Sequence, residues 1–463
     1  MSPRFSSFRS PNTALGGLLL VLVLMLAGCL HERLTWSPDG RQAAVITLDG
    51  LYLTDAAGTL SPLLLPGAYR AAWCPDSRRL VVARKRELKT FQDLATLLGP
   101  VRTQALIDKA EAVWQPWKRK PVGDEKTPDF KIDRDSGAVA LYLREHHRER
   151  LRERFADHWN DIESATAEWH TLSVVRVAPG LLEPEVTLQE GLCEFTQILP
   201  APSGSAVAWV APVELGADSD PSLHLWLTPI NGQKSPVVVA RHVAGFPDWA
   251  ADGRSLVVLR STGRAPGGDD LRLGSLTTYP VLSAEGQLLA ESKGEDLAGL
   301  IFNDTSRIRG LRDGRVLFNA TAFALPMVVS EDPPLRDEFF VVDPMTRRIT
   351  RLLAPGVLDL LPKSLAQVEV SPDEAHLLVS DDSGKVWLLT LADARVEVIC
   401  AGFGKGDSIA PAWRAPGDFT YRKPGGLRND LIQRSGGKET VLSRTWPAEV
   451  LARLVESPEP GAK

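Results

Sequence analysis

Hydrophobic and polar positions follow the same order at seven places along the chain. Each copy has an apolar run, a turn rich in Pro, Asp, Ser and Gly, and a second apolar run. Proline fixes φ at the start of such a turn, Asp or Ser bonds its own backbone, and Gly accepts positive φ, so each copy predicts a β-hairpin. The copies are LTWSPDGRQAAVI at 34–46, AAWCPDSRRLVVA at 71–83, ILPAPSGSAVAWV at 198–210, PDWAADGRSLVVL at 247–259, IRGLRDGRVLFN at 308–319, VEVSPDEAHLLVS at 368–380 and PAWRAPGDFTYR at 411–422.

Further short apolar segments follow most of these hairpins. Third strands are predicted at GLYLTD (50–55), LHLWLT (223–228), EFFVVD (338–343) and KVWLLT (385–390), and fourth strands at SPVVVA (235–240), RRITRLL (347–353) and RVEVIC (395–400). Four strands per repeated unit are typical of propeller blades, whose faces are buried only when the units close into a ring. We therefore expect an all-β fold, a seven-bladed β-propeller over 34–443, with six or eight blades as the alternatives.

The turn motif resembles that of a known family. The run Trp-Ser-Pro-Asp-Gly, followed by a polar residue and an apolar strand, is similar to the TolB-type propeller repeat, a relative of WD-repeat propellers. The matching positions are Trp36, Pro38, Asp39 and Gly40, then Trp73, Pro75 and Asp76, and finally Ser371, Pro372 and Asp373. The resemblance implies a propeller, although TolB itself has six blades behind a small α/β domain and this chain has seven copies of the motif.

The second predicted blade is interrupted by an insertion at 87–170, which is not strand-like. Gly99 and Pro100 indicate the end of one helix and the start of another. Farther along, apolar residues form a narrow stripe at helical spacing on a charged segment, namely Leu151, Phe155, Trp159 and Ile162. We expect a helical insertion that packs on the rim of the propeller, docks a partner, covers the channel or, as the weakest alternative, contacts a membrane.

The first 28 residues have the pattern of an export signal. Arg4 and Arg9 precede an uncharged apolar run that is too short to cross a bilayer as a helix. The tetrad Leu-Ala-Gly-Cys at 26–29 resembles the lipobox of bacterial lipoproteins. The resemblance implies cleavage between Gly28 and Cys29, a diacylglyceryl group on the Cys29 sulfur and acylation of the new amine, which together anchor the chain to a membrane.

Several expectations follow from this anchor. The segment 29–33 becomes a lipidated tether, and 444–463 a C-terminal tail beyond the propeller. Leu30 is not the Asp that keeps such proteins at an inner membrane, so the periplasmic face of the outer membrane is the expected location; in a Gram-positive cell it is the outer face of the cytoplasmic membrane. The short tether would hold the first blade within about 20 Å of the bilayer, making the opposite face or the insertion the expected docking surface.

The charge and the cysteine content of the chain bear on its partners and on its disulfides. The net charge of −5 and pI near 6.0 lack the basic surplus of a nucleic-acid-binding protein, so we expect no nucleic acid partner. Besides Cys29, the chain contains Cys74, Cys193 and Cys400 at wide spacing. They are interpreted as small buried hydrophobic residues, with one long-range disulfide as the alternative.

No linear motif for catalysis or cofactor binding was found. Four histidines lie in or beside the insertion, but no HExxH or Cys/His pattern accompanies His146, His147, His158 and His170, so no metal or cofactor is expected. A GxSxG elbow is also missing, which predicts that the chain is not an enzyme. Trp36, Trp73, Trp209, Trp226, Trp249, Trp387 and Trp413 lie in predicted strands and are interpreted as core residues rather than ligand-stacking groups.

Together these observations predict a membrane-anchored extracytoplasmic β-propeller lipoprotein. Its expected role is that of a protein-binding platform or scaffold in the bacterial envelope, because a rigid ring presents loops on two faces. The alternative is an envelope enzyme or small-ligand-binding protein whose site lies in the central channel, built from residues of several blades.

Overall fold

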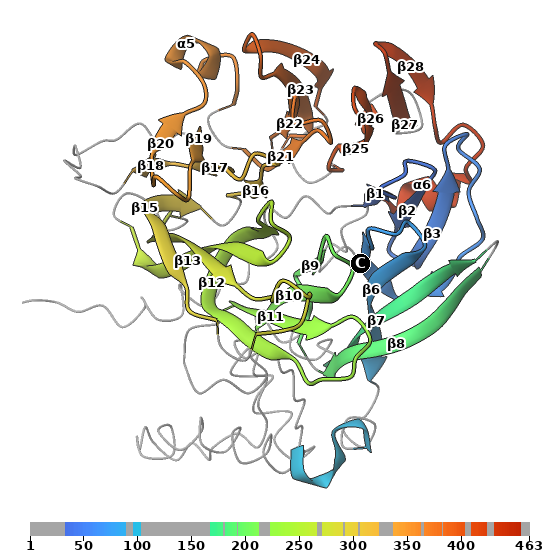
Figure 1. Cartoon of the computed structure of the whole chain (residues 1–463). Coiled ribbons are helices and arrows are strands. Elements are labelled where there is room, and N and C mark those ends of the chain that lie inside the picture. Colours follow the sequence, from blue (N-terminus) through green and yellow to red (C-terminus); the bar gives the residue numbers. More distant parts are fainter. Residues whose placement is uncertain are drawn as a thin grey trace, which may run out of the picture.

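The repeated hairpins form antiparallel sheets that are arranged around a common centre in a computed structural model of the chain (Figure 1). Strands β1, β9, β16, β21 and β25 lie nearest this centre. The structure describes residues 33–88, 96–102, 167–178, 181–191, 193–212, 223–265, 271–289, 292–303, 306–323, 337–362, 365–381, 383–402, 409–423 and 430–454.

Two four-stranded sheets come first in the sequence. One contains β1 (Leu34–Trp36), β2 (Gln42–Ile46), β3 (Gly50–Asp55) and β4 (Leu65–Pro66). The other contains β5 (Ala68–Trp73), β6 (Arg79–Leu88), β7 (Ala167–Ala178) and β8 (Leu181–Gly191).

Three more four-stranded sheets come from the last third of the chain. The first has β16 (Ile308–Gly310), β17 (Val316–Ala320), β19 (Glu338–Val342) and β20 (Ile349–Arg351). The second has β21 (Gln367–Val370), β22 (His376–Ser380), β23 (Lys385–Thr390) and β24 (Arg395–Ala401). The third has β25 (Ala412–Ala415), β26 (Asp418–Lys423), β27 (Asp430–Ser435) and β28 (Lys438–Val441), and two short helices follow β20 and β28, α5 (Pro355–Leu358) and α6 (Ala448–Arg453).

The sixth sheet has eight strands and is continuous through β12. It contains β9 (Gln197–Pro200), β10 (Ala206–Pro212), β11 (Leu223–Pro229), β12 (Val237–Trp249), β13 (Ser255–Arg264), β14 (Leu271–Pro280), β15 (Glu295–Asn303) and β18 (Ala322–Phe323). The first part of β12 pairs with β11 and its second part pairs with β13. His242 has a positive φ of 56° between the two parts, so one long strand serves two of the predicted hairpin units.

All seven predicted hairpins are confirmed. The inner strand of each pairs with the next strand in antiparallel register. One residue of each turn has a positive φ, which belongs to Gly40, Ser77, Gly204, Gly253, Gly314, Glu374 and Gly417. At Gly40 a Cβ would stand 2.9 Å from the carbonyl oxygen of Arg414, so both the backbone angle and the neighbouring strand favour glycine there. The degraded copies therefore keep the turn geometry after losing part of the sequence motif.

The tryptophans of the repeat connect neighbouring sheets. The indole N–H of Trp73 donates to the carbonyl of Thr35, and that of Trp413 donates to the carbonyl of Glu369, at 2.9 and 3.1 Å. Trp249 makes the same kind of bond within the eight-stranded sheet. All seven predicted core tryptophans are buried or packed against buried clusters, which confirms their interpretation as core residues.

The first and last sheets pack directly against each other. The Trp36 indole N–H donates to the Thr420 hydroxyl at 2.9 Å, and the Trp446 indole N–H donates to the carbonyl of Gly58 at 2.9 Å. One apolar cluster combines residues of β1 to β3 with residues of β27 and α6. Residues 446–454, expected to be part of a tail, thus pack between the first and last sheets. Burial of the apolar side chains of Trp446, Val450 and Leu451 in this cluster stabilises the arrangement.

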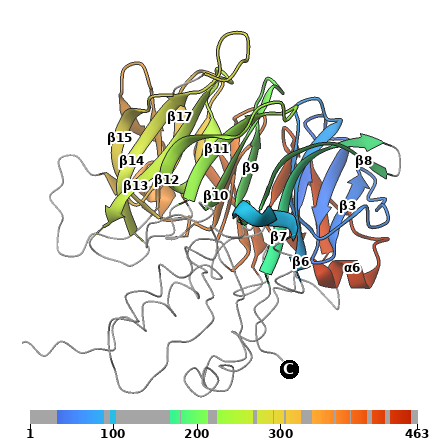
Figure 2. The same ribbon diagram turned by 90° about the horizontal axis from the view of Figure 1, so that it is seen from below.

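The ring has two distinct faces. We call the side that carries the seven hairpin turns the turn face. The opposite side, the insertion face, carries the start of β1 at Leu34, the end of β6 at Leu88, the start of β7 at Ala167, and α6 (Figure 2). Leu88 and Ala167 are direct partners in the ladder, so β6 and β7 extend into the range expected for the insertion. Residues 96–102 are helical, whereas the apolar stripe from Leu151 to Ile162 lies outside the described residues.

Cys74, Cys193 and Cys400 are buried and form no disulfide with one another, so the interpretation as small buried hydrophobic residues is confirmed and a disulfide among these three is wrong. Burial raises the pKa of Cys74 to about 12. The signal segment, Gly28 and Cys29 lie outside the described residues. Within the described ranges, no helix has both the length and the apolar character needed to span a bilayer.

Candidate functional site

A central cavity of about 700 Å³ lies where the inner strands meet. Residues of β1, β5, β9, β12, β16, β21 and β25 all line it, together with residues of the adjoining turns. A concave site with a few convergent polar groups is the usual form of a ligand pocket. The side chains of these strands that face the cavity therefore make up the candidate site.

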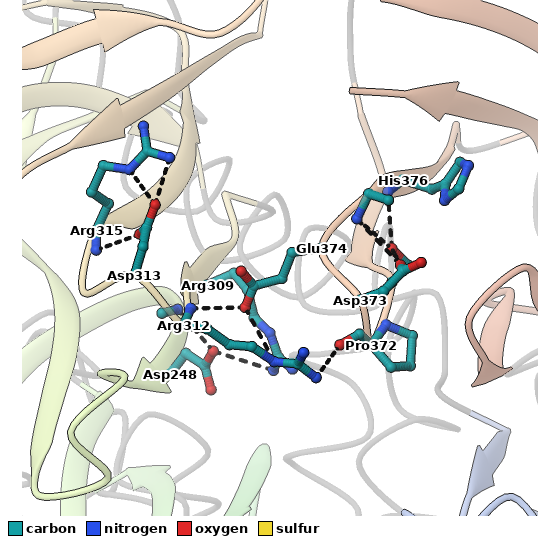
Figure 3. A network of polar contacts seen from close by, with 12 residues as sticks. Asp248, Arg309, Arg312, Asp313, Arg315, Pro372, Asp373, Glu374 and His376 are labelled. Carbon is teal, nitrogen blue, oxygen red and sulfur yellow. Dashed lines mark hydrogen bonds and ion pairs between the residues drawn. The ribbon is translucent and has the colours of Figure 1, made fainter. Parts of the chain in front are cut away.

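Near the turn face, an ion pair joins two neighbouring inner strands. Asp248 stands on β12, and its carboxylate oxygen Oδ2 accepts hydrogen bonds from the Arg309 guanidinium at 3.3 Å and from the Gly310 backbone N–H at 3.2 Å. Both donors belong to β16, so the carboxylate links the eight-stranded sheet to the next one. Figure 3 shows this pair beside the turns of the two following hairpins.

A second contact continues the network across the turns. The backbone N–H of Arg312 donates to the carboxylate of Glu374 at 2.8 Å, and the Arg312 guanidinium donates to the carbonyl of Pro372 (Figure 3). The Arg312 guanidinium also lies 4.0 Å from the Glu374 carboxylate. Three adjacent hairpin units are thus connected by charged groups around one side of the cavity, which we call the charged mouth (Asp248, Arg309, Arg312, Glu369 and Glu374).

The two partners of the central ion pair differ in exposure. The Asp248 side chain is 14% exposed, whereas that of Arg309 is 53% exposed. Burial raises the pKa of the Asp248 carboxyl although Arg309 opposes the shift. Asp248 in turn raises the pKa of Arg309. The attraction between the two groups is favourable for both, but for Asp248 the cost of burying the charged carboxylate outweighs it.

The charged mouth follows the sequence repeat. Asp248, Arg309 and Glu369 each stand five residues before the positive-φ residue of their own turn. The Glu369 carboxylate accepts a hydrogen bond from the Gln367 amide at 3.0 Å. Other copies carry Thr35, Ala72, Leu199 and Ala412 at this position. An alignment of the seven copies by their turns would have shown that three consecutive copies carry a charged residue at the same repeat position. The search for linear motifs missed this signal.

Two residues farther from the turns, the same alignment gives a different set of side chains. Arg33, Arg70 and Arg307 stand seven residues before their positive-φ residues, as do Gln197 and Gln367. Arg33 is only 8% exposed, and burial together with the charge of Arg70 lowers its pKa to about 10. The Nε of Arg70 is buried and makes no hydrogen bond within the described ranges. We call Arg33 and Arg70 the arginine pair.

One more buried polar group faces the cavity at this level. Asn319 of β17 lines the cavity and is 1% exposed. Its side-chain oxygen accepts the backbone N–H of Arg307 at 2.6 Å, whereas its Nδ2 is buried and has no hydrogen-bond partner among the residues that the structure describes. A buried amide donor without a partner is costly, so Asn319 adds a second polar group that could receive a ligand.

Of the four histidines in or beside the insertion, His170 is the one that the structure describes. His170 stands on β7, and its Nδ1 lies 3.1 Å from the Tyr69 hydroxyl. Burial, with the nearby charge of Lys85, lowers the pKa of His170 to about 4. His146, His147 and His158 lie outside the described residues. Across the described ranges there is no group of three or more His, Cys, Asp or Glu side chains that could hold a metal ion.

No family model matches the chain, and no curated protein matches it. Among solved structures it is similar to TolB from Acinetobacter baumannii, at 15% identity over 58% of this chain and 57% of that chain, with a TM-score of 0.37. It is similar to an oligogalacturonate lyase from Vibrio parahaemolyticus at 8% identity, covering 88% and 90% of the two chains, with a TM-score of 0.48. It is also similar to prolyl oligopeptidase B from Galerina marginata, at 9% identity over 94% of this chain and 55% of that chain, with a TM-score of 0.47.

These neighbours are propeller-type proteins, and the likeness is one of fold. The chain spans little more than half the length of TolB and of the oligopeptidase. The prediction that the chain is not an enzyme is corrected by this set, because it includes a peptidase and a lyase. That prediction relied on the absence of a linear motif, and a cavity built from strands of all seven hairpin units can bring side chains together without one.

Proposed function

We propose that the chain is a lipid-anchored extracytoplasmic β-propeller that acts as a protein-binding platform in the bacterial envelope. The observation that carries the proposal is the charged mouth, where Asp248, Arg309, Arg312 and Glu374 from three adjacent units converge on one rim of the cavity. Positive and negative side chains that alternate along a rim favour one orientation of a binding partner with complementary charges. The Leu-Ala-Gly-Cys tetrad at 26–29 supports the anchor.

The same proposal includes seven blades. The eight-stranded sheet contains two of the seven hairpin turns and counts as two blades that share β12. The helical insertion belongs to the second of the seven blades, formed by β5 to β8, and lies between β6 and β7. Closure by packing of Trp36 and Trp446 between the first and last sheets supports a single complete ring.

The orientation of the ring follows from its two faces. Arg33 is four residues after Cys29 and lies at the insertion face, so an anchored Cys29 would hold this face within about 20 Å of the membrane. Because β6 ends and β7 begins at the same face, both attachment points of the insertion also lie on the side of the ring that faces the bilayer. The turn face with the charged mouth then points away from the membrane and is the surface that a partner reaches.

Site-specific crosslinking in the native cell tests the platform. A photoreactive residue at Ala251, which lines the cavity at the turn face, should give a defined protein adduct. The matched control is Val237 at the exposed start of β12, where no defined adduct is expected. Asp248→Ala should abolish the Ala251 adduct. The platform loses its support if both positions give the same adducts or if Ala251 gives none.

Two further variants test the anchor and the insertion. Cys29→Ser should move the protein out of the membrane fraction, and its retention there would contradict the lipoprotein assignment. Residues 89–166 can be replaced by a two-residue turn such as Asn-Gly, because Leu88 and Ala167 already face each other in the ladder. If the mouth is the docking surface, this shortened ring should still give the Ala251 adduct; loss of the adduct by a folded ring would move the docking surface to the insertion.

A role in binding or converting a small ligand is the second candidate. It is favoured by the raised pKa of Asp248, which makes this carboxyl a better proton acceptor than an exposed one, and by the unpartnered Asn319 Nδ2 in the same cavity. The test is mass spectrometry of small molecules that are retained by the purified full chain and released on unfolding. A retained or converted molecule that is lost in both Asp248→Asn and Asn319→Leu would favour this candidate.

A further inference from the structure

The arginine pair lies at the wall of the cavity, which Arg70 lines. Arg33 is 8% exposed and stands next to β1, while Arg70 stands at the equivalent position of β5 in the next sheet. The two are close enough for the charge of Arg70 to lower the pKa of Arg33. Neither arginine forms an ion pair within the described part of the chain. Two guanidinium groups thus repel each other in a partly water-excluded place.

The surrounding acidic groups do not remove this imbalance. The charges that act on Tyr69, the residue before Arg70, include Glu194 and Glu168, but neither forms an ion pair with Arg33 or Arg70 among the described residues. Glu168 instead pairs with Lys85 at 2.7 Å and lies 3.7 Å from the His170 ring. By contrast, Arg309 and Arg312 at the charged mouth contact Asp248 and Glu374. Burying a charge without a partner is costly, so a negative group bound beside the arginine pair would be favourable.

We propose that the arginine pair binds an oxyanion, a carboxylate or phosphate group of a ligand that occupies the insertion-face end of the central cavity. The proposal rests on the proposed use of this cavity as a binding site. Arg70 lines the cavity and has a buried Nε with no hydrogen bond among the described residues. A guanidinium presents N–H donors in a planar fork that matches two oxygens of a carboxylate or phosphate.

The position of the pair suits such a ligand. Arg70, Gln197 and Gln367 line the cavity at one repeat position, and Arg33 stands at the same position of the first copy, beside Arg70. Asn319 Nδ2 supplies a further donor to the cavity wall. An anion between the arginines would satisfy the Arg70 Nε and remove the repulsion between the pair. Binding and stability are therefore coupled at this end of the cavity.

Thermal unfolding of the purified full chain in a non-ionic detergent tests the proposal. Sodium phosphate and sodium acetate are each titrated against sodium chloride at constant ionic strength, so that the two arms separate phosphate from carboxylate recognition. We expect at least one oxyanion to raise the Tm in a saturable way. Arg70→Gln should weaken that response about tenfold or more, since it removes a charge-assisted pair of hydrogen bonds.

A merely structural arginine would behave differently in the same assay. Arg70→Gln should raise the Tm in chloride, because the repulsion is relieved, and at the same time lose the oxyanion response. The matched control is Arg176→Gln on β7, whose guanidinium pairs with Glu185 outside the cavity and which should keep the full response. The proposal is overturned if neither oxyanion exceeds chloride, or if Arg70→Gln responds as the wild type does. Crosslinking at Ala251 needs no added anion, so failure of the proposed platform would be seen separately.

Discussion

The two ends of the central cavity carry arginines in opposite circumstances. At the turn face, Arg309 and Arg312 contact the carboxylates of Asp248 and Glu374. At the insertion face, neither Arg33 nor Arg70 forms an ion pair among the described residues, and the pKa of Arg33 is lowered to about 10 by burial and by the charge of Arg70. The ring itself therefore balances the charges at one end and leaves them unbalanced at the other, so removal of a charge should have opposite consequences for stability at the two ends.

The largest effect is expected from Asp248→Ala. The substitution removes the acceptor of the Gly310 backbone N–H and the partner of Arg309, which both lie on the neighbouring sheet. Loss of a buried acceptor with a charged partner should lower the free energy of unfolding by about 2 kcal/mol. Urea unfolding followed by tryptophan fluorescence measures this change. The matched control is Asp393→Ala, an exposed turn residue that accepts only the Arg395 backbone N–H at 3.2 Å; equal losses in the two variants would contradict the role of the mouth.

A change of opposite sign is expected at the other end. Arg33→Met keeps an apolar stem in a buried position and removes a charge that has no carboxylate partner among the described residues. Replacing such a charge with a well-packed apolar side chain should raise the free energy of unfolding by about 1 kcal/mol. Arg41→Met serves as the control, because the Arg41 side chain is 85% exposed and its loss should change little. A lower free energy of unfolding for Arg33→Met would contradict this prediction, because it would show that the charge of Arg33 stabilises the fold.

The fold could be predicted from the sequence because the turn chemistry is local. Proline, Asp and Gly fix a turn within a few residues, so all seven hairpins were found, including the turn in which Glu374 replaces Gly and still adopts a φ of 59°. The continuity of β12 was not foreseen, because two units share one strand and no turn residue separates them. The packing of Trp446 and α6 was missed for a related reason. Their partner Gly58 is 388 residues away in sequence.

The central channel was expected as the alternative location of a site, but the residues of the candidate site were not predicted, because they share no linear motif. Asp248, Arg309 and Glu369 are separated by about 60 residues each and become neighbours only when the ring forms. The repeat position that they share was visible in the sequence, but each residue alone resembles an ordinary polar residue of a strand. Arg33 was counted as part of the tether, since nothing nearby in the sequence indicates that it would be buried beside Arg70.

The smallest expected effect is on the pH dependence of stability, which should differ between the buried carboxyl of the charged mouth and an exposed carboxyl in a turn. The pKa of Asp248 is raised by burial, so the folded chain keeps its proton to a higher pH than the unfolded chain does. Between the unfolded value near 3.9 and the raised folded value, protonation of Asp248 therefore adds stability as the pH falls. Asp313 has the opposite sign, because the hydrogen bond from Arg315 lowers its pKa and its contribution is lost as the pH falls. Urea unfolding between pH 3 and 7 should show a steeper acid loss for Asp248→Asn than for the wild type, and a shallower loss for Asp313→Asn. Identical pH slopes for the two variants would contradict the difference in environment between the cavity rim and the turn surface.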